Sequence, residues 1–239
     1  MRISFDPMGS REQFHDNQNV VHLVNLCFEH CGDELFNDIL LLIKRTSLEK
    51  AEDYLNAMEK KYNRIGKISL FHDLKSTFLE IYSDDQVANL RGGFLELLSS
   101  RVFNDLFVVN MSSFDCKVII EKGSVGKWCS PKTVDIGIGC ESEGLVSECK
   151  ISKSDLDYEI INNLLMIKEK SNGFFSLFVV TLEDERELYL RLREIKFQNP
   201  FYDLNKIAVV SKDNFYNFCT GSFEKYDDIK KSVFVKNLA

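Results

Sequence analysis

The stretch TVDIGIGCESEGLVSECKI, from Thr133 to Ile151, decides the fold that we expect for the rest of the chain. It contains two short segments in which side chains alternate in character, and the turn-prone run 139–144 (GCESEG) separates them. Alternation with a period of two is typical of strands, and two such segments joined by a glycine-bearing turn predict a β-hairpin.

Three charged residues of this hairpin are expected to share one face. Successive side chains of a strand point to opposite faces, so Glu148 and Lys150 project together. Antiparallel pairing then brings Asp135 beside them. Two carboxylates and a lysine in front of an apolar face are too costly for a simple core, so they indicate a functional site. The alternative is an exposed strand face that carries a solvated ion pair.

A Glu-x-Lys triplet alone has little specificity in this chain. Two further examples, Glu59–Lys61 and Glu194–Lys196, lie in helical patterns, where residues two apart do not share a face. Asp115–Lys117 lies in a strand-like pattern, but no aspartate-bearing strand precedes it. Only Glu148–Lys150 combines a strand, an upstream aspartate and a hairpin.

The order of these residues resembles a known nuclease motif. Asp135, followed after twelve intervening residues by Glu148-Cys149-Lys150, resembles the PD-(D/E)xK nuclease superfamily, which has the restriction-endonuclease-like fold. The resemblance covers roughly residues 88–220. The chain departs from the motif at Val134, where the pattern has a proline that is widely replaced in the family.

The resemblance implies an α/β fold with an αβββαβ core, and the patterns along the chain agree with it. We expect a helix, then a first strand and the two hairpin strands, and then helix and strand in alternation. The expected ranges are helix 86–107, strand 116–121, the hairpin at 133–151, helix 155–170, strand 174–182, helix 183–196, strand 206–210 and a short helix near 213–219.

The resemblance also implies the chemistry of the site. Asp135 and Glu148 would hold one or two Mg²⁺ ions, for which Mn²⁺ can substitute, and the carbonyl of Cys149 would be a further ligand. Lys150 would hydrogen-bond the attacking water or help to deprotonate it. Glu96, on the helix that opens the core, is a further site candidate by resemblance. The alternative for Glu96 is a solvated helix glutamate.

The first third of the chain reads differently. Residues 1–83 are expected to form a helical module behind a loose tail of about ten residues, and residues 84–239 to form the nuclease domain. The helices are expected at 13–31, 33–45, 47–63 and 68–81. The run Leu40–Ile43 is more apolar than one helix face can bury, which favours dimerisation or binding of a partner protein.

The charge of the chain bears on nucleic-acid binding. The net charge is −7, and residues 1–90 carry 10 basic against 15 acidic residues. Since Lys and Arg supply most non-specific affinity for DNA, we expect a local basic patch, a divalent cation or a partner protein to support DNA binding.

Localisation follows from what the chain lacks. No apolar run approaches the ~20 residues needed to span a bilayer. The first residues contain no apolar segment of a secretory signal, and the seven scattered cysteines contain no CxxC pair. These features are typical of a cytoplasmic protein with reduced thiols.

The leading expectation is therefore a cytoplasmic, Mg²⁺-dependent DNA endonuclease, acting in restriction or another anti-phage defence. DNA repair is an alternative role for the same activity. The competing class is a non-catalytic subunit of the same fold that binds DNA or protein. Intact Asp135, Glu148 and Lys150 favour the enzyme.

Overall fold

The protein is described here by a computed structural model, which covers residues 1–9, 11–106, 109–123, 126–141 and 143–219. Internal contacts divide the chain into two compact units. The sheet unit consists of Met1–Glu12 and Leu98–Ala239, and the helical unit consists of Gln13–Leu97. The chain thus leaves the sheet unit early and returns to it within one long helix. The functional division proposed at residue 83 stays a prediction.

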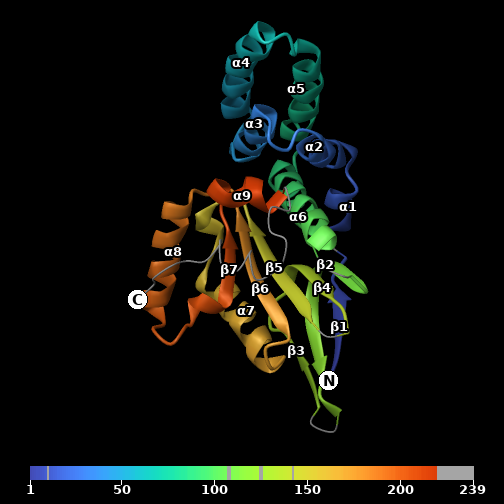
Figure 1. Ribbon diagram of the computed structural model, residues 1–239, viewed down its shortest axis with the longest axis vertical. Coiled ribbons are helices and arrows are strands. Elements are labelled where there is room, and N and C mark those ends of the chain that lie inside the picture. Colours follow the sequence, from blue (N-terminus) through green and yellow to red (C-terminus); the bar gives the residue numbers. More distant parts are fainter. Residues whose placement is uncertain (10, 107–108, 124–125, 142, 220–239) are drawn as a thin grey trace. The chain divides into compact units, whose positions relative to one another are not determined.

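One mixed sheet organises the sheet unit, and within the described residues it has seven strands (Figure 1). Their order is β1-β2-β4-β5-β6-β7, and β3 pairs with β2 away from this path. The pairs among β1 to β5 are antiparallel, whereas β5–β6 and β6–β7 are parallel. The strands are β1 Arg2–Pro7, β2 Met111–Glu121, β3 Lys127–Cys129, β4 Val134–Gly139, β5 Gly144–Lys150, β6 Phe175–Thr181 and β7 Ile207–Val210.

The helices that alternate with these strands give the expected order. They are α6 Val87–Leu106, α7 Tyr158–Lys170, α8 Glu185–Gln198 and α9 Lys212–Cys219, with short 3-10 turns at Lys153–Asp155 and Leu204–Lys206. The α/β class and the αβββαβ order α6-β2-β4-β5-α7-β6-α8-β7 are confirmed. The short strand β3, which holds Trp128, lies between the expected strand 116–121 and the hairpin and was not predicted.

Apolar runs on the central strands explain why the hairpin lies in the interior. All six residues of β4 and the first six of β5 are buried, because each strand has a neighbour on both sides and cover on both faces. Aromatic rings fill the core beside β6: the ring of Phe103, in the second half of α6, lies 5.0 Å from Phe178 and 5.2 Å from Phe218. Charged groups on β4 and β5 are therefore placed in a largely apolar surrounding.

The expectation of a loose tail over the first ten residues is wrong. Arg2–Pro7 forms β1, whose Phe5 is paired with Val118 of β2. The Phe5 ring reaches across the sheet to β4, where a Cβ on Gly137 would lie only 2.6 Å from its Cε1 atom. The strand is stabilised by this distant pairing, which a local pattern of six residues does not reveal.

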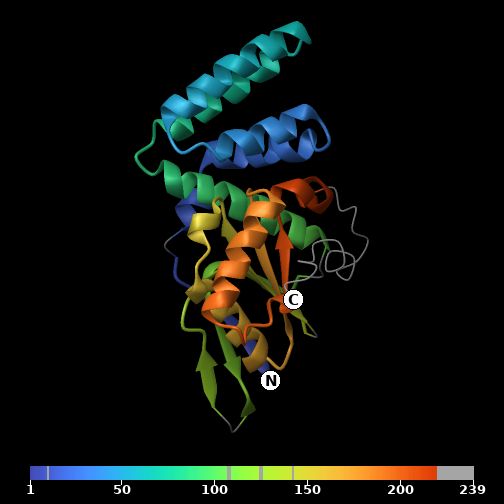
Figure 2. The same cartoon turned by 90° about the vertical axis from the view of Figure 1, so that its left-hand side faces the viewer.

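The helical unit contains most of the predicted helices (Figure 2). They are α2 Gln18–Glu29, α3 Glu34–Ile43, α4 Leu48–Arg64 and α5 Ile68–Tyr82. The unit also contains the first half of α6 and, apart from Glu12, the short α1 Glu12–His15. The helix expected over 13–31 is interrupted, because the side chain of Asn17 accepts the backbone N–H groups of Asn19 and Val20 and starts a new helix.

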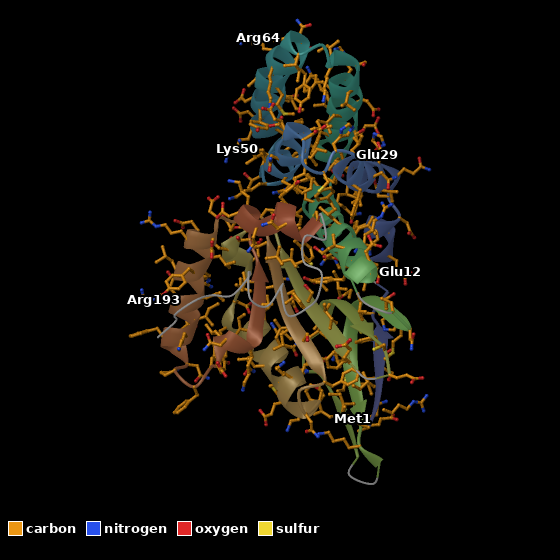
Figure 3. The ribbon with its side chains drawn as sticks, viewed as in Figure 1. Met1, Glu12, Glu29, Lys50, Arg64 and Arg193 are labelled. Atoms are coloured by element: carbon orange, nitrogen blue, oxygen red, sulfur yellow. The ribbon has the colours of Figure 1, made fainter. Side chains whose placement is uncertain are left out.

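The apolar run on α3 is used inside the helical unit. Leu40, Leu42 and Ile43 are buried within this chain, and only Leu41 is partly exposed, so the run does not by itself require a partner; binding of a partner through these helices stays a prediction. The outward faces carry charged residues such as Glu29, Lys50 and Arg64 (Figure 3). Among the helices that the structure describes, none has the length and apolar character to cross a membrane.

Candidate active site

The β4–β5 hairpin places the three charged residues as its pattern predicts. Ile136 on β4 pairs with Ser147 on β5, and the next step of this antiparallel register sets Asp135 against Glu148. Lys150 follows two residues later on the same face, at the last position of β5, where it pairs with Thr181 of β6. The cluster therefore lies at the carboxyl end of β5, a central strand flanked by β4 and β6.

The three side chains are in direct contact. Lys150 Nζ lies 2.7 Å from Asp135 Oδ2 and 2.9 Å from Glu148 Oε2. The backbone N–H of Cys149 donates a second hydrogen bond to Asp135 Oδ2, at 2.7 Å. Asp135 and Glu148 are 6% and 3% exposed, which excludes the alternative of a solvated ion pair on an exposed strand face.

Burial and charge set the ionisation of the cluster. Burial, and then the negative charge of Asp135, raise the pKa of Glu148 to about 8, although Lys150 opposes this shift. Burial alone would lower the pKa of Lys150, but Asp135 and Glu148 raise it above its ordinary value. At neutral pH the lysine is therefore an ammonium ion, and burial beside Asp135 disfavours ionisation of Glu148.

The donor set fits a divalent cation. Mg²⁺ prefers carboxylate oxygens, commonly binds through one or two of them and keeps several waters. Asp135 and Glu148 supply that number, and the carbonyl of Cys149, which lies between Glu148 and Lys150 in the chain, is the further ligand that the family resemblance implies. The described residues contain no group of three or more His, Cys, Asp or Glu side chains arranged for a metal. Water and substrate would thus complete the coordination.

Glu96 belongs to the helical unit, and its place in the site stays a prediction. It is fully buried, and its Oε2 atom lies 2.7 Å from His15 Nε2, so the alternative of a solvated helix glutamate is wrong. Sequence reasoning missed His15 because 81 residues separate it from Glu96.

A fourth charged residue contacts the cluster, and it was also missed. Arg11 lies between β1 and α1, and its Nη1 atom is 3.6 Å from Asp135 Oδ1. Nothing local marks this arginine, since it lies at the boundary between the expected tail of about ten residues and the expected helices. The contact depends on β1 being part of the sheet.

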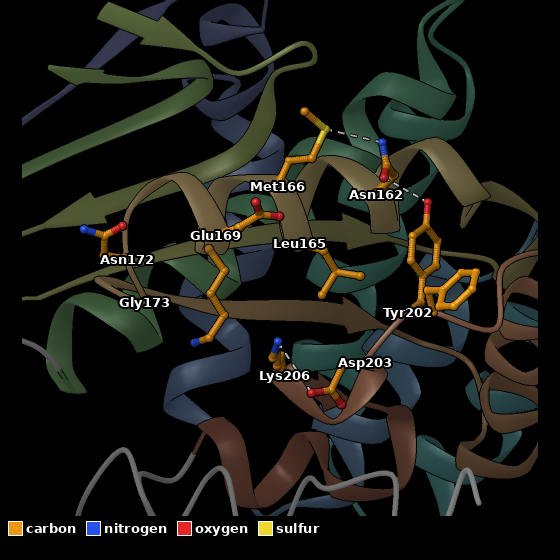
Figure 4. A pocket seen from close by; sticks show the side chains of 11 residues that line it. Asn162, Leu165, Met166, Glu169, Asn172, Gly173, Tyr202, Asp203 and Lys206 are labelled. Carbon is orange, nitrogen blue, oxygen red and sulfur yellow. Dashed lines mark hydrogen bonds and ion pairs between the residues drawn. The ribbon is translucent and has the colours of Figure 1, made fainter. Parts of the chain in front are cut away.

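A cavity of about 490 Å³ lies elsewhere on the sheet unit, along α7 (Figure 4). Its lining mixes two lysines with two acidic residues, and Tyr202 donates a hydrogen bond to Asn162 at 2.9 Å. The residues that line it are Asn162, Leu165, Met166, Lys168, Glu169, Asn172, Gly173, Phe201, Tyr202, Asp203 and Lys206. None of these residues belongs to the charged cluster.

Comparisons with known proteins give distant similarities. No family model matches the chain, and no curated protein matches it. The chain is similar to the solved structure of protein VC1899 from Vibrio cholerae, with 13% identity and a TM-score of 0.45 over 95% of this chain. It spans 59% of that longer protein.

A second solved structure is the small subunit (R.BspD6I2) of the heterodimeric restriction endonuclease R.BspD6I. The identity is 12% and the TM-score 0.41, over 68% of this chain and 86% of that one. The fold class of this chain rests on its own strands and helices and not on these similarities.

Proposed function

We propose that this protein is a metal-dependent deoxyribonuclease that hydrolyses phosphodiester bonds at Asp135, Glu148 and Lys150. One observation carries the proposal: the ammonium nitrogen of Lys150 lies within 2.9 Å of an oxygen of each of two buried carboxyl groups, at the carboxyl end of a central strand. Burying ionisable groups costs free energy, and perturbed ionisation of this kind is frequent at functional sites.

The three residues would divide the work. A cation held by Asp135, Glu148 and the Cys149 carbonyl would supply Lewis-acid stabilisation of the phosphate and a more acidic water. Lys150, which its neighbours keep protonated, would orient that water by hydrogen bonding and offset negative charge that develops on the phosphate. The contact of 2.7 Å with Asp135 holds the ammonium group in place. Of the two roles considered for Lys150, the structure therefore favours hydrogen bonding over deprotonation.

The proposed setting is the cytoplasm, in restriction or another anti-phage defence, with DNA as substrate. The net charge of −7 supports dependence on a divalent cation or a partner protein for DNA affinity. The helical unit, whose outer faces are charged, is our candidate for contact with that partner or with a second copy of the chain.

A non-catalytic subunit remains the second candidate, and a specific observation favours it. Asp135 already has two cationic neighbours, Lys150 at 2.7 Å and Arg11 at 3.6 Å, as a purely structural ion cluster would. Such a cluster would stabilise the sheet without reacting.

Plasmid cleavage separates the two. Supercoiled DNA is incubated with the protein in Mg²⁺, Mn²⁺ or EDTA, and nicked and linear products are quantified. We expect cleavage with either metal and none in EDTA. Asp135→Asn, Glu148→Gln and Lys150→Met should each reduce the rate by at least about 100-fold, because each removes a metal ligand or a charge at the reacting phosphate.

Lys196→Met is the matched control, since Lys196 occupies the same position in a Glu-x-Lys triplet on α8. It should cut at the wild-type rate. A Lys150→Met protein that is folded and cuts as fast as the wild type would remove the assignment. Absence of metal-dependent cleavage by the wild type, with DNA binding retained, would favour the non-catalytic subunit.

A further inference from the structure

Arg11 shares Asp135 with Lys150. The two cations face different oxygens of one carboxylate: Arg11 Nη1 is 3.6 Å from Oδ1, and Lys150 Nζ is 2.7 Å from Oδ2. The arginine contact is longer than a hydrogen bond, whereas the lysine contact is a short one. Asp135 is therefore held mainly by Lys150 and by the backbone N–H of Cys149, and its contact with Arg11 is the longer one.

Three features of the fold bring Arg11 to this position. Pro7, the last residue of β1, pairs with Cys116, and the next backbone N–H, of Met8, donates to the carbonyl of Asp115 at 3.0 Å. Asp115 has a positive φ of 40° and is skipped in the β2–β4 register at the position facing Asp135. Gly9, with a φ of 68°, then turns the chain. The N-terminal segment is thus anchored beside the site.

The exposure of Arg11 suits contact with a ligand. Its side chain is 25% exposed, compared with 18% for Lys150 and 9% for Asp135. A guanidinium is planar, is always charged and presents five donors that match phosphate oxygens two at a time. A phosphate that approaches the carboxylates would therefore meet Arg11 as well as Lys150.

We propose that Arg11 is a phosphate-binding residue of this site, which donates hydrogen bonds to a non-bridging oxygen of the DNA phosphodiester. This inference rests on the nuclease function proposed above. Arg11 binds and orients the phosphate while Lys150 stays with the carboxylates, and no proton or covalent bond is transferred at Arg11. It also adds a cation at the site of an otherwise acidic chain.

The test uses the full-length protein with Arg11→Ala, Arg11→Gln and Arg11→Lys. Binding of a labelled DNA duplex is followed by fluorescence anisotropy in EDTA at several salt concentrations, and plasmid cleavage is measured in Mg²⁺. Each phosphate contact contributes about 0.9 to the slope of log affinity against log salt. Arg11→Ala and Arg11→Gln should lower that slope by about this amount and slow cleavage by about 100-fold. Arg11→Lys keeps the charge but loses the paired N–H donors of the guanidinium, so we expect the wild-type salt slope and an intermediate cleavage rate.

Arg2→Ala is the matched control, because Arg2 lies on the same N-terminal segment but at the far end of β1, opposite Glu121. It should keep both the slope and the rate. If Arg11 only balances the charge of Asp135, Arg11→Ala will lower the melting temperature and leave the slope unchanged, and the inference is overturned.

The two proposals fail differently. If the wild type cleaves DNA and the Arg11 variants bind and cleave it equally well, the role of Arg11 is overturned. The proposed nuclease function is then unaffected. A wild type that neither binds nor cleaves DNA overturns both.

Discussion

Glu148 is a carboxyl group whose ionisation opposes folding. Its pKa is raised from 4.5 to about 8 by burial and by Asp135. The native protein therefore holds this proton more tightly than the unfolded chain does. The resulting stabilisation is complete below about pH 4.5 and is lost progressively as the pH rises through 8.

The raised pKa of Glu148 predicts how the stability of the wild type and of Glu148→Gln differs with pH in the absence of metal. The two should have similar stability near pH 5, where Glu148 is protonated in the native state. Near pH 8 the variant should be more stable by on the order of 2–4 kcal/mol, because it has no proton to lose. Urea unfolding at a series of pH values measures the difference. A difference that does not grow with pH would contradict the assigned ionisation.

Added Mg²⁺ gives this comparison a second readout. A cation between Asp135 and Glu148 would offset their repulsion, so it should raise the melting temperature of the wild type. Glu148→Gln should show a much smaller rise. Equal shifts in the two proteins would argue that the cation binds elsewhere.

The alternation of side chains along a strand explains why some site residues could be predicted and others could not. Asp135, Glu148 and Lys150 share a face because alternation within one hairpin fixes where their side chains point. Arg11 and His15 acquire their partners only when segments far apart in the chain come together. No local pattern encodes such contacts.

At the scale of elements, β1 and β4 depend on each other through Phe5 and Gly137. A Cβ at Gly137 would lie 2.6 Å from Phe5 Cε1, which is closer than real Cβ atoms approach, and 3.0 Å from the sulfur of Cys116, which is a tight contact. The glycine is therefore needed for the space it leaves above β4, so that the ring of the edge strand can lie over the sheet.

Gly137→Ala should consequently destabilise the protein by about 1–3 kcal/mol, the usual cost of overpacking a core. In a Phe5→Ala background the same change should cost less by about 1 kcal/mol, because the ring that it meets is gone. Urea unfolding of the two single variants and the double variant measures this coupling. Strictly additive losses would show that the ring does not set the cost.

Helices were easier to predict than edge strands, for a physical reason. The side chains of Ser47 and Asn17 accept hydrogen bonds from backbone N–H groups two or three residues away, so neighbouring residues in the sequence determine where these helices begin. Asn17 nevertheless divides the helix that was expected over 13–31, because it starts α2. The strands β1 and β3 each gain their hydrogen bonds from β2 and have little pattern of their own.

At the scale of the whole molecule, the oligomeric state can be predicted and measured directly. Cutting both strands of a duplex requires two hydrolyses of opposite polarity, which a two-fold dimer can provide. Light scattering on the intact chain should therefore give about twice 27.6 kDa, alone or once DNA is added. A monomer under both conditions would point to a separate partner protein or to nicking of single strands.

Shortening the chain at residue 84 would not answer this question. That cut removes β1 as well as the helices and leaves β2 as an unpaired edge, which invites aggregation. That residues 1–12 belong to the sheet unit and not to the helical unit could not be predicted, since only the pairing of β1 with β2 reveals it.

The position of β1 also has a consequence for the order in which the protein folds. Its partner β2 begins at Met111, so the whole of Gln13–Leu97 must be synthesised before the first strand can pair. Closing so large a loop is slow, whereas the local contacts of helices form early. Trp128, the only tryptophan, lies on β3 beside β2 and reports on the sheet.

During refolding from urea, circular dichroism at 222 nm should recover before the fluorescence of Trp128 does. Removing Arg2–Pro7 should leave the fast helical phase intact and alter the slow one. Coincident recovery of both signals would mean that the two units fold as one. During synthesis, β1 stays unpaired while roughly a hundred further residues are added, so it is exposed to chaperones.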